Sequence, residues 1–100
     1  MIIYNVTINI DPSVHEDWLQ WMREVHIPEV LETNLFVDNR ILKVLGDDVS
    51  EGFTYSIQYT CNSMEDYENY KHNHAPELQR KHTERYKDKF VSFRTLLEII

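Results

Sequence analysis

Residues 53–61 read FTYSIQYTC, with aromatic, aliphatic or sulfur side chains at the odd positions and Thr, Ser or Gln at the even ones. Successive side chains of a strand point to opposite faces of a sheet, so this alternation predicts a strand with one apolar and one polar face. Residues 2–10, IIYNVTINI, have the same period, with Asn5, Thr7 and Asn9 on the polar side. The two segments therefore predict two strands of a sheet that is buried on its apolar face.

A helical pattern follows the first of these strands. Apolar residues recur at helical spacing between Val14 and Val25. Pro28 is expected to break or kink this helix, because proline lacks the N–H group and its ring crowds the carbonyl group four residues earlier. A short second helical piece is predicted from Pro28 to Thr33, with Asn34 near its end.

The second half of the chain repeats this order of elements. Ser63 is a favourable helix N-cap, and the helix that it begins is expected to be interrupted at Pro76 and to continue to Phe90. Two further strands are predicted, at residues 36–45 and 91–100. The loop that follows the first of them is predicted at residues 46–52. The resulting order, βαββαβ, predicts a ferredoxin-like α+β fold, in which two kinked helices cover one face of a four-stranded antiparallel sheet.

Length and composition exclude several classes of protein. The chain has 100 residues, so we expect a single domain over residues 1–100. Its formal net charge of −7 argues against a non-specific nucleic-acid binder, which needs a basic face. The two glycines, Gly46 and Gly52, are too few for a glycine-rich phosphate loop, and the single cysteine, Cys61, excludes a multi-cysteine metal site. We therefore expect no nucleic-acid partner, no cofactor and no metal.

The sequence also carries signals about the compartment. No apolar run approaches the roughly 20 residues that a membrane-spanning helix needs. The chain begins Met-Ile-Ile-Tyr-Asn-Val, which alternates as a strand does and lacks the basic segment of a signal peptide. We therefore expect a cytoplasmic protein with no membrane partner.

The polar face of the two patterned strands carries no charged side chain. It consists of amide and hydroxyl residues: Asn5, Thr7, Asn9, Thr54, Ser56, Gln58 and Thr60. In a chain with 27% charged residues, seven exposed positions would be expected to hold about two charges. An uncharged polar surface suits a face that is covered but must still satisfy its hydrogen bonds. We therefore expect a homodimer in which a second copy packs its sheet on this one; the alternative is the solvated face of a monomer.

Several features combine over nearly the whole chain: its length, the βαββαβ order, Trp18 and Trp21 in the first helix, and His26 two residues before Pro28. With them the chain resembles the dimeric α/β-barrel superfamily, which includes antibiotic-biosynthesis-type monooxygenases and muconolactone isomerases. Within it the chain is most similar to a small bacterial family of unknown function, on the segments HIPEV (26–30), YSIQY (55–59) and FRTLLE (93–98). The resemblance implies a dimeric barrel and says little about chemistry, because this fold hosts unrelated activities.

His26 is the candidate catalytic residue. It lies just before the Pro28 kink, and the resemblance implies a ligand pocket there, between the helices and the sheet. An imidazole titrates near neutrality and is therefore suited to acid–base catalysis. The alternative is that His26 bonds the backbone group freed by Pro28 and holds the kink. The side chains expected to line the pocket are Trp18, Met22, Tyr55, Tyr59, Tyr70, His74 and Arg94.

Arg94 lies inside the last predicted strand between apolar neighbours, and a buried arginine needs a carboxylate. A structural ion pair is expected, with Glu98, Asp38 or Glu29 as its partner or with a group across the dimer. The alternative is that Arg94 binds the carboxylate of a substrate.

Two functions remain open. The first is a small-molecule protein that binds or transforms a small planar organic molecule, as a cofactor-independent monooxygenase- or isomerase-like enzyme. The second is a non-catalytic dimeric binding or structural module, in which the same residues hold a kink and a core. A connected cavity in contact with His26 would favour the first, and a core closed around His26, with its ring nitrogens bonded to the backbone, would favour the second.

Overall fold

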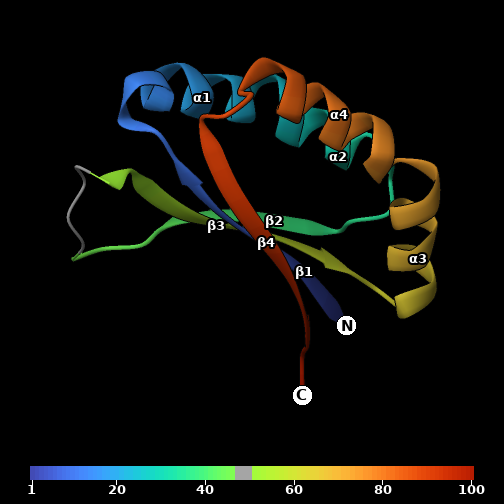
Figure 1. Cartoon of the computed structure of the whole chain (residues 1–100). Coiled ribbons are helices and arrows are strands. Elements are labelled where there is room, and N and C mark those ends of the chain that lie inside the picture. The colour runs from blue at the N-terminus through green and yellow to red at the C-terminus, as the bar shows by residue number, and fades with distance from the viewer. Residues whose placement is uncertain (47–50) are drawn as a thin grey trace.

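Two nine-residue strands, β1 (Ile2–Ile10) and β3 (Phe53–Cys61), lie side by side at the centre of the fold (Figure 1). The edge strands are β2 (Asp38–Lys43), next to β3, and β4 (Phe90–Glu98), next to β1. All three pairings are antiparallel. The strand order β2–β3–β1–β4 and the chain order βαββαβ confirm the predicted ferredoxin-like α+β fold.

The computed structural model describes residues 1–46 and 51–100. Residues 47–50, which belong to the predicted loop, lie outside the described residues. The predicted bounds of the first and third strands are confirmed, whereas β2 is shorter than the predicted 36–45.

The strand register places alternate residues of neighbouring strands on one face. Val6 pairs with Ile57 on β3 and with Arg94 on β4, so these three side chains share a face of the sheet. Figure 1 shows the helices on one side of the sheet, and the hydrophobic core lies between the two layers. None of the helices in residues 1–46 and 51–100 covers the opposite face, which we call the open face.

The first helical segment runs without interruption through four pieces: η1 (Pro12–Val14), α1 (His15–Trp21), η2 (Met22–His26) and α2 (Ile27–Leu31). Pro28 does not break it. Instead η2 is a π-helical turn, in which the N–H of Ile27 donates to the carbonyl of Met22 five residues earlier. The wider turn leaves Pro28 in the first turn of α2, where a missing N–H costs little.

The second helical segment is divided as predicted. Ser63 caps α3 (Met64–Asn73) by accepting a bond from the N–H of Asp66, and His74 separates α3 from α4 (Ala75–Arg85). The helix ends before Phe90, which corrects the prediction, because Asp88 turns the chain with a φ of 62° and Phe90 then begins β4. Within residues 1–46 and 51–100, no helix has the length and apolarity needed to cross a membrane.

Candidate functional site

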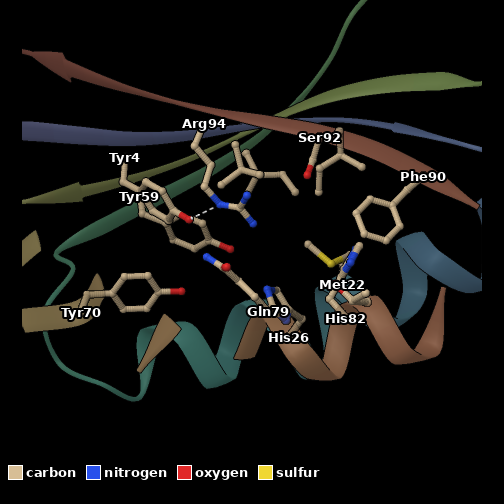
Figure 2. A pocket seen from close by; sticks show the side chains of 14 residues that line it. Tyr4, Met22, His26, Tyr59, Tyr70, Gln79, His82, Phe90, Ser92 and Arg94 are labelled. Atoms are coloured by element: carbon tan, nitrogen blue, oxygen red, sulfur yellow. Dashed lines mark hydrogen bonds between the residues drawn. The ribbon is translucent and has the colours of Figure 1, made fainter. Parts of the chain in front are cut away.

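A cavity of about 170 Å³ lies between the helix-covered face of the sheet and the helices (Figure 2). Strands β1, β3 and β4 form its floor, and η2, α3 and α4 form its roof. Its lining residues are Tyr4, Val6, Ile8, Met22, His26, Ile57, Tyr59, Tyr70, Gln79, His82, Thr83, Phe90, Ser92 and Arg94. Nine of these fourteen side chains carry a polar group, and the other five are apolar: Val6, Ile8, Met22, Ile57 and Phe90.

A second, more open hollow of about 320 Å³ adjoins this cavity. The two share Tyr4, Tyr70, Gln79 and Arg94 in their walls. These four residues therefore lie where the inner cavity meets the surface, and we call this place the mouth.

His26 reaches the cavity from the π-helical turn. Its ring stacks on Trp21 at 5.2 Å between centroids and meets His82 edge-on at 5.8 Å. Burial, followed by the positive charges of Arg94 and Lys81, lowers the pKa of His26 to about 4, so the ring is neutral at pH 7. No hydrogen bond between described residues involves the ring, so the alternative in which His26 bonds the freed backbone is not what the structure shows.

His82 faces the same cavity from α4 and has a defined protonation state. Its Nε2 atom lies 2.9 Å from Nε1 of Trp18. An indole N–H can only donate, so Nε2 of His82 must carry the lone pair and the proton of the neutral ring lies on Nδ1. Burial, then the charges of His26 and Arg94, lower the pKa of His82 to about 4. Two neutral histidines in contact therefore line one wall.

This bond predicts a difference between two substitutions of His82. His82→Leu leaves the buried Trp18 N–H without an acceptor, and we expect the free energy of unfolding to fall by about 2 kcal/mol. His82→Gln keeps an acceptor, its side-chain oxygen, as many bonds from the backbone as Nε2 of histidine. The loss of unfolding free energy in this variant should therefore be clearly smaller. Urea denaturation of both variants measures the two losses. Equal losses would show that the Trp18–His82 bond contributes nothing specific.

Arg94 points from β4 into the space at the mouth, and its Nε donates to the hydroxyl of Tyr4 at 2.9 Å (Figure 2). The expected ion pair is not formed: among the described residues, none of the salt bridges includes Arg94. Glu29 instead pairs with Lys81 at 3.0 Å. Arg94 and Glu98 are four positions apart on an extended strand, which separates them by about 13 Å along the strand axis.

Two further phenols, Tyr59 and Tyr70, extend toward the cavity. Burial raises the pKa of both hydroxyls, and the neighbouring tyrosines raise it further, so both remain protonated at neutral pH. Within the described part of the chain, neither hydroxyl has a hydrogen-bond partner, and the same holds for the amide of Gln79. Among the described residues, every fully buried polar side-chain atom has a hydrogen-bond partner. Because these hydroxyl and amide groups have none, they are not fully buried, and their polar atoms remain accessible from the cavity.

Five of the eight side chains that the sequence suggested for the site line the cavity: Met22, His26, Tyr59, Tyr70 and Arg94. Trp18 lies behind His82 and is fully buried. Tyr55 is engaged elsewhere, with its hydroxyl 2.6 Å from Nε2 of His15. His74 sits at the break between α3 and α4, with its ring centroid 6.4 Å from that of Tyr70.

The sequence reading missed several lining residues, of which Tyr4, Gln79, His82, Thr83 and Ser92 are polar. For two of them, the spacing in the sequence could have indicated a place in the site. Gln79 lies three residues before His82 and so shares its face of α4, and Ser92 lies two residues before Arg94 and so shares its face of β4. In the ranges that the structure describes, no group of three or more His, Cys, Asp or Glu side chains could hold a metal ion.

Comparisons with known proteins agree with this architecture. The family model for "Domain of unknown function (DUF4286)" matches residues 1–100. HapK from Hahella chejuensis has a TM-score of 0.74 at 8% identity, covering 100% of this chain and 93% of that one. A putative antibiotic biosynthesis monooxygenase from Nitrosomonas europaea has a TM-score of 0.71 at 11% identity, with 100% and 99% covered. A dimeric ferredoxin-like protein from an uncultured marine organism has a TM-score of 0.71 at 15% identity, with 100% and 95% covered. No curated protein matches the chain in sequence. These likenesses show the ferredoxin-like α+β fold and leave the activity to be argued from the site.

Proposed function

The chain belongs to the family described as Domain of unknown function (DUF4286), and from the site itself we propose that it binds and transforms a small planar organic molecule in the cavity. One observation carries the proposal: the polar groups of His26, Tyr59, Tyr70 and Gln79 converge on the cavity, and within the described residues none has a protein partner. A purely structural core would pair such groups with one another.

The size and walls of the cavity indicate the ligand. A cavity of roughly 150 Å³ is enough to hold one benzene ring, and this one measures about 170 Å³. The rings of Tyr59, Tyr70 and Phe90 offer flat apolar surfaces. A molecule with a single aromatic or conjugated ring fits these walls.

His26 is the residue we assign to proton transfer. A neutral imidazole without a protein partner can take a proton from a C–H or O–H group of the ligand and return it. The negative charge that the ligand gains would lie near Arg94, which favours it, and would also raise the pKa of His26 toward the working range. Proton removal of this kind begins both isomerase-like and cofactor-independent monooxygenase-like reactions.

Binding can be tested with benzamide, benzoate and acetophenone, followed through the amide signals of the ¹⁵N-labelled protein. We expect at least one of the three to shift the signals of residues around the cavity, such as Gln79 and Thr83, in a saturable way. If none does so with the folded protein, the proposed function is wrong.

Proton transfer is tested separately with acetophenone in deuterated water. We expect the protein to accelerate exchange of the methyl hydrogens, and His26→Gln to reduce the acceleration at least tenfold. His72→Gln, a change at an exposed histidine on α3, is the matched control and should leave it unchanged. Saturable binding without any exchange would favour the non-catalytic binding module over the enzyme.

We further propose that the protein is a homodimer joined through the open face. Side chains there form their own polar ladder: Ser56 donates to Asn5 at 2.5 Å, Asn5 to Thr7 at 3.1 Å, and Asn9 to Thr54 at 3.0 Å. Beside this ladder, β4 presents large apolar residues to the same face: Val91, Phe93 and Leu97, each 42% exposed or more. A satisfied polar strip next to an uncovered apolar one is what the middle of a dimer interface requires.

A further inference from the structure

The strongest unexplained feature of the cavity is its charge. Among the described residues that line the cavity, Arg94 is the only one with a permanent charge, and none is an aspartate or glutamate. This is unexpected in a chain with 17 acidic residues against 10 basic ones. Arg94 is one of the positive charges that lower the pKa of both His26 and His82, and Lys81 on α4, which also acts on His26, is paired with Glu29. The lining thus carries the positive charge of Arg94 and no carboxylate to balance it.

We propose that the ligand is a carboxylate, whose two oxygens are held at the mouth by the guanidinium of Arg94 and the hydroxyl of Tyr4. This proposal rests on the proposed function and narrows its ligand to a one-ring organic acid. The ring would lie inward, between Met22 and Phe90, and the acid group would remain at the mouth.

The hydrogen-bond donors at the mouth match this group. A guanidinium has five N–H donors, and Arg94 uses its Nε for Tyr4. The two Nη atoms make no hydrogen bond to any described residue, and together they fit the two oxygens of a carboxylate. Tyr4 accepts from Arg94 through its oxygen, so its own O–H is free to donate. Figure 2 shows the guanidinium directed toward Gln79 and His26, in the space between β4 and α4.

The position of Arg94 at the surface also favours a charged ligand. Arg94 is exposed as a residue, because β4 is an edge strand, so pairing it with a carboxylate does not require both charges to leave water completely. The apolar ring can be buried in the cavity while the acid group stays partly hydrated. A neutral amide of the same shape would gain the ring contacts but not the ion pair.

Benzoate and benzamide have the same shape and differ in charge, and their binding can be compared through the two tryptophans, Trp18 and Trp21. These are the only tryptophans in the chain, and both contact cavity histidines. We expect benzoate to bind at least tenfold more tightly than benzamide at pH 7. Arg94→Gln should weaken benzoate about tenfold, remove the preference and leave benzamide unchanged.

Arg80→Gln is the matched control, because Arg80 is an exposed arginine on α4 that pairs with Glu77 and Glu84 away from the cavity. It should leave the affinity for both probes unchanged. Equal affinities for the two probes, or benzoate binding that survives Arg94→Gln, would overturn the carboxylate assignment and leave the proposed function standing. If neither probe binds the folded protein, the carboxylate assignment is wrong, and the proposed function then stands or falls with the binding of acetophenone.

Discussion

Lowering the pH from 7 to 4 is expected to reduce the free energy of unfolding by about 3 kcal/mol for each of the two cavity histidines. In the folded protein the pKa of His26 and of His82 is lowered from 6.5 to about 4, mainly by burial. The unfolded chain therefore takes up protons at these positions between pH 6.5 and pH 4, while the folded protein does not. Protons bound by the unfolded state favour unfolding, so stability is lost as the pH falls through this range and the loss levels off near pH 4.

Chemical denaturation in steps of pH measures this slope. The double variant His26→Gln/His82→Gln should have a much flatter profile between pH 6.5 and pH 4 than the parent protein, because neither glutamine titrates. His72→Gln, at an exposed position on α3, should keep the parent profile. Carboxylates such as Asp11, whose pKa is lowered by its bonds to Ser13, also make stability depend on pH. Their effect occurs at lower pH than that of the histidines, and it is the same in all these variants. A double variant with an undiminished slope would mean that the histidines are not held neutral by the fold.

The fold could be predicted from the sequence because it depends on side-chain periodicity. The alternation in residues 2–10 and 53–61 sets the two central strands, and Ser63 and Pro76 set the beginning and the break of the second helix. The π-helical turn before Pro28 could not be predicted, because a proline indicates that the helix is irregular and does not say which form the irregularity takes.

The site could be predicted only in part, because periodicity gives the face of a residue and not its position along the element. Tyr55 and Tyr59 share a face of β3, but they are about 13 Å apart along the strand, and Tyr59 alone reaches the cavity. The partner of Arg94 was expected to be a carboxylate, and it is the phenol of Tyr4, which is 90 residues away in sequence. The Trp18–His82 bond likewise joins residues 64 positions apart, and no local spacing indicates it.

The dimer proposed above should be broken by one charge placed at the middle of the open face. Thr7 lies on the central strand β1, in register with Ser56 on one side and with Phe93 on the other. In the proposed dimer Thr7→Lys would bring an unpaired ammonium group, and by symmetry a second one, into a covered interface. The desolvation cost of such charges is several kcal/mol, which corresponds to a loss in dimer affinity of roughly a hundredfold or more.

Sedimentation velocity over a range of concentrations can separate the two outcomes. The parent protein should sediment as a dimer, and Thr7→Lys as a monomer or, where the apolar residues of β4 are left uncovered, as larger aggregates. Gln20→Lys makes the same change of charge at an exposed position of α1, on the helical layer, and should remain dimeric. Circular dichroism of the monomeric fraction shows whether the subunit is still folded. A parent protein that is monomeric at every concentration, or a Thr7→Lys variant that stays an unchanged dimer, would mean that the uncharged face of β1 and β3 has another cause, and the proposed interface would have to be given up.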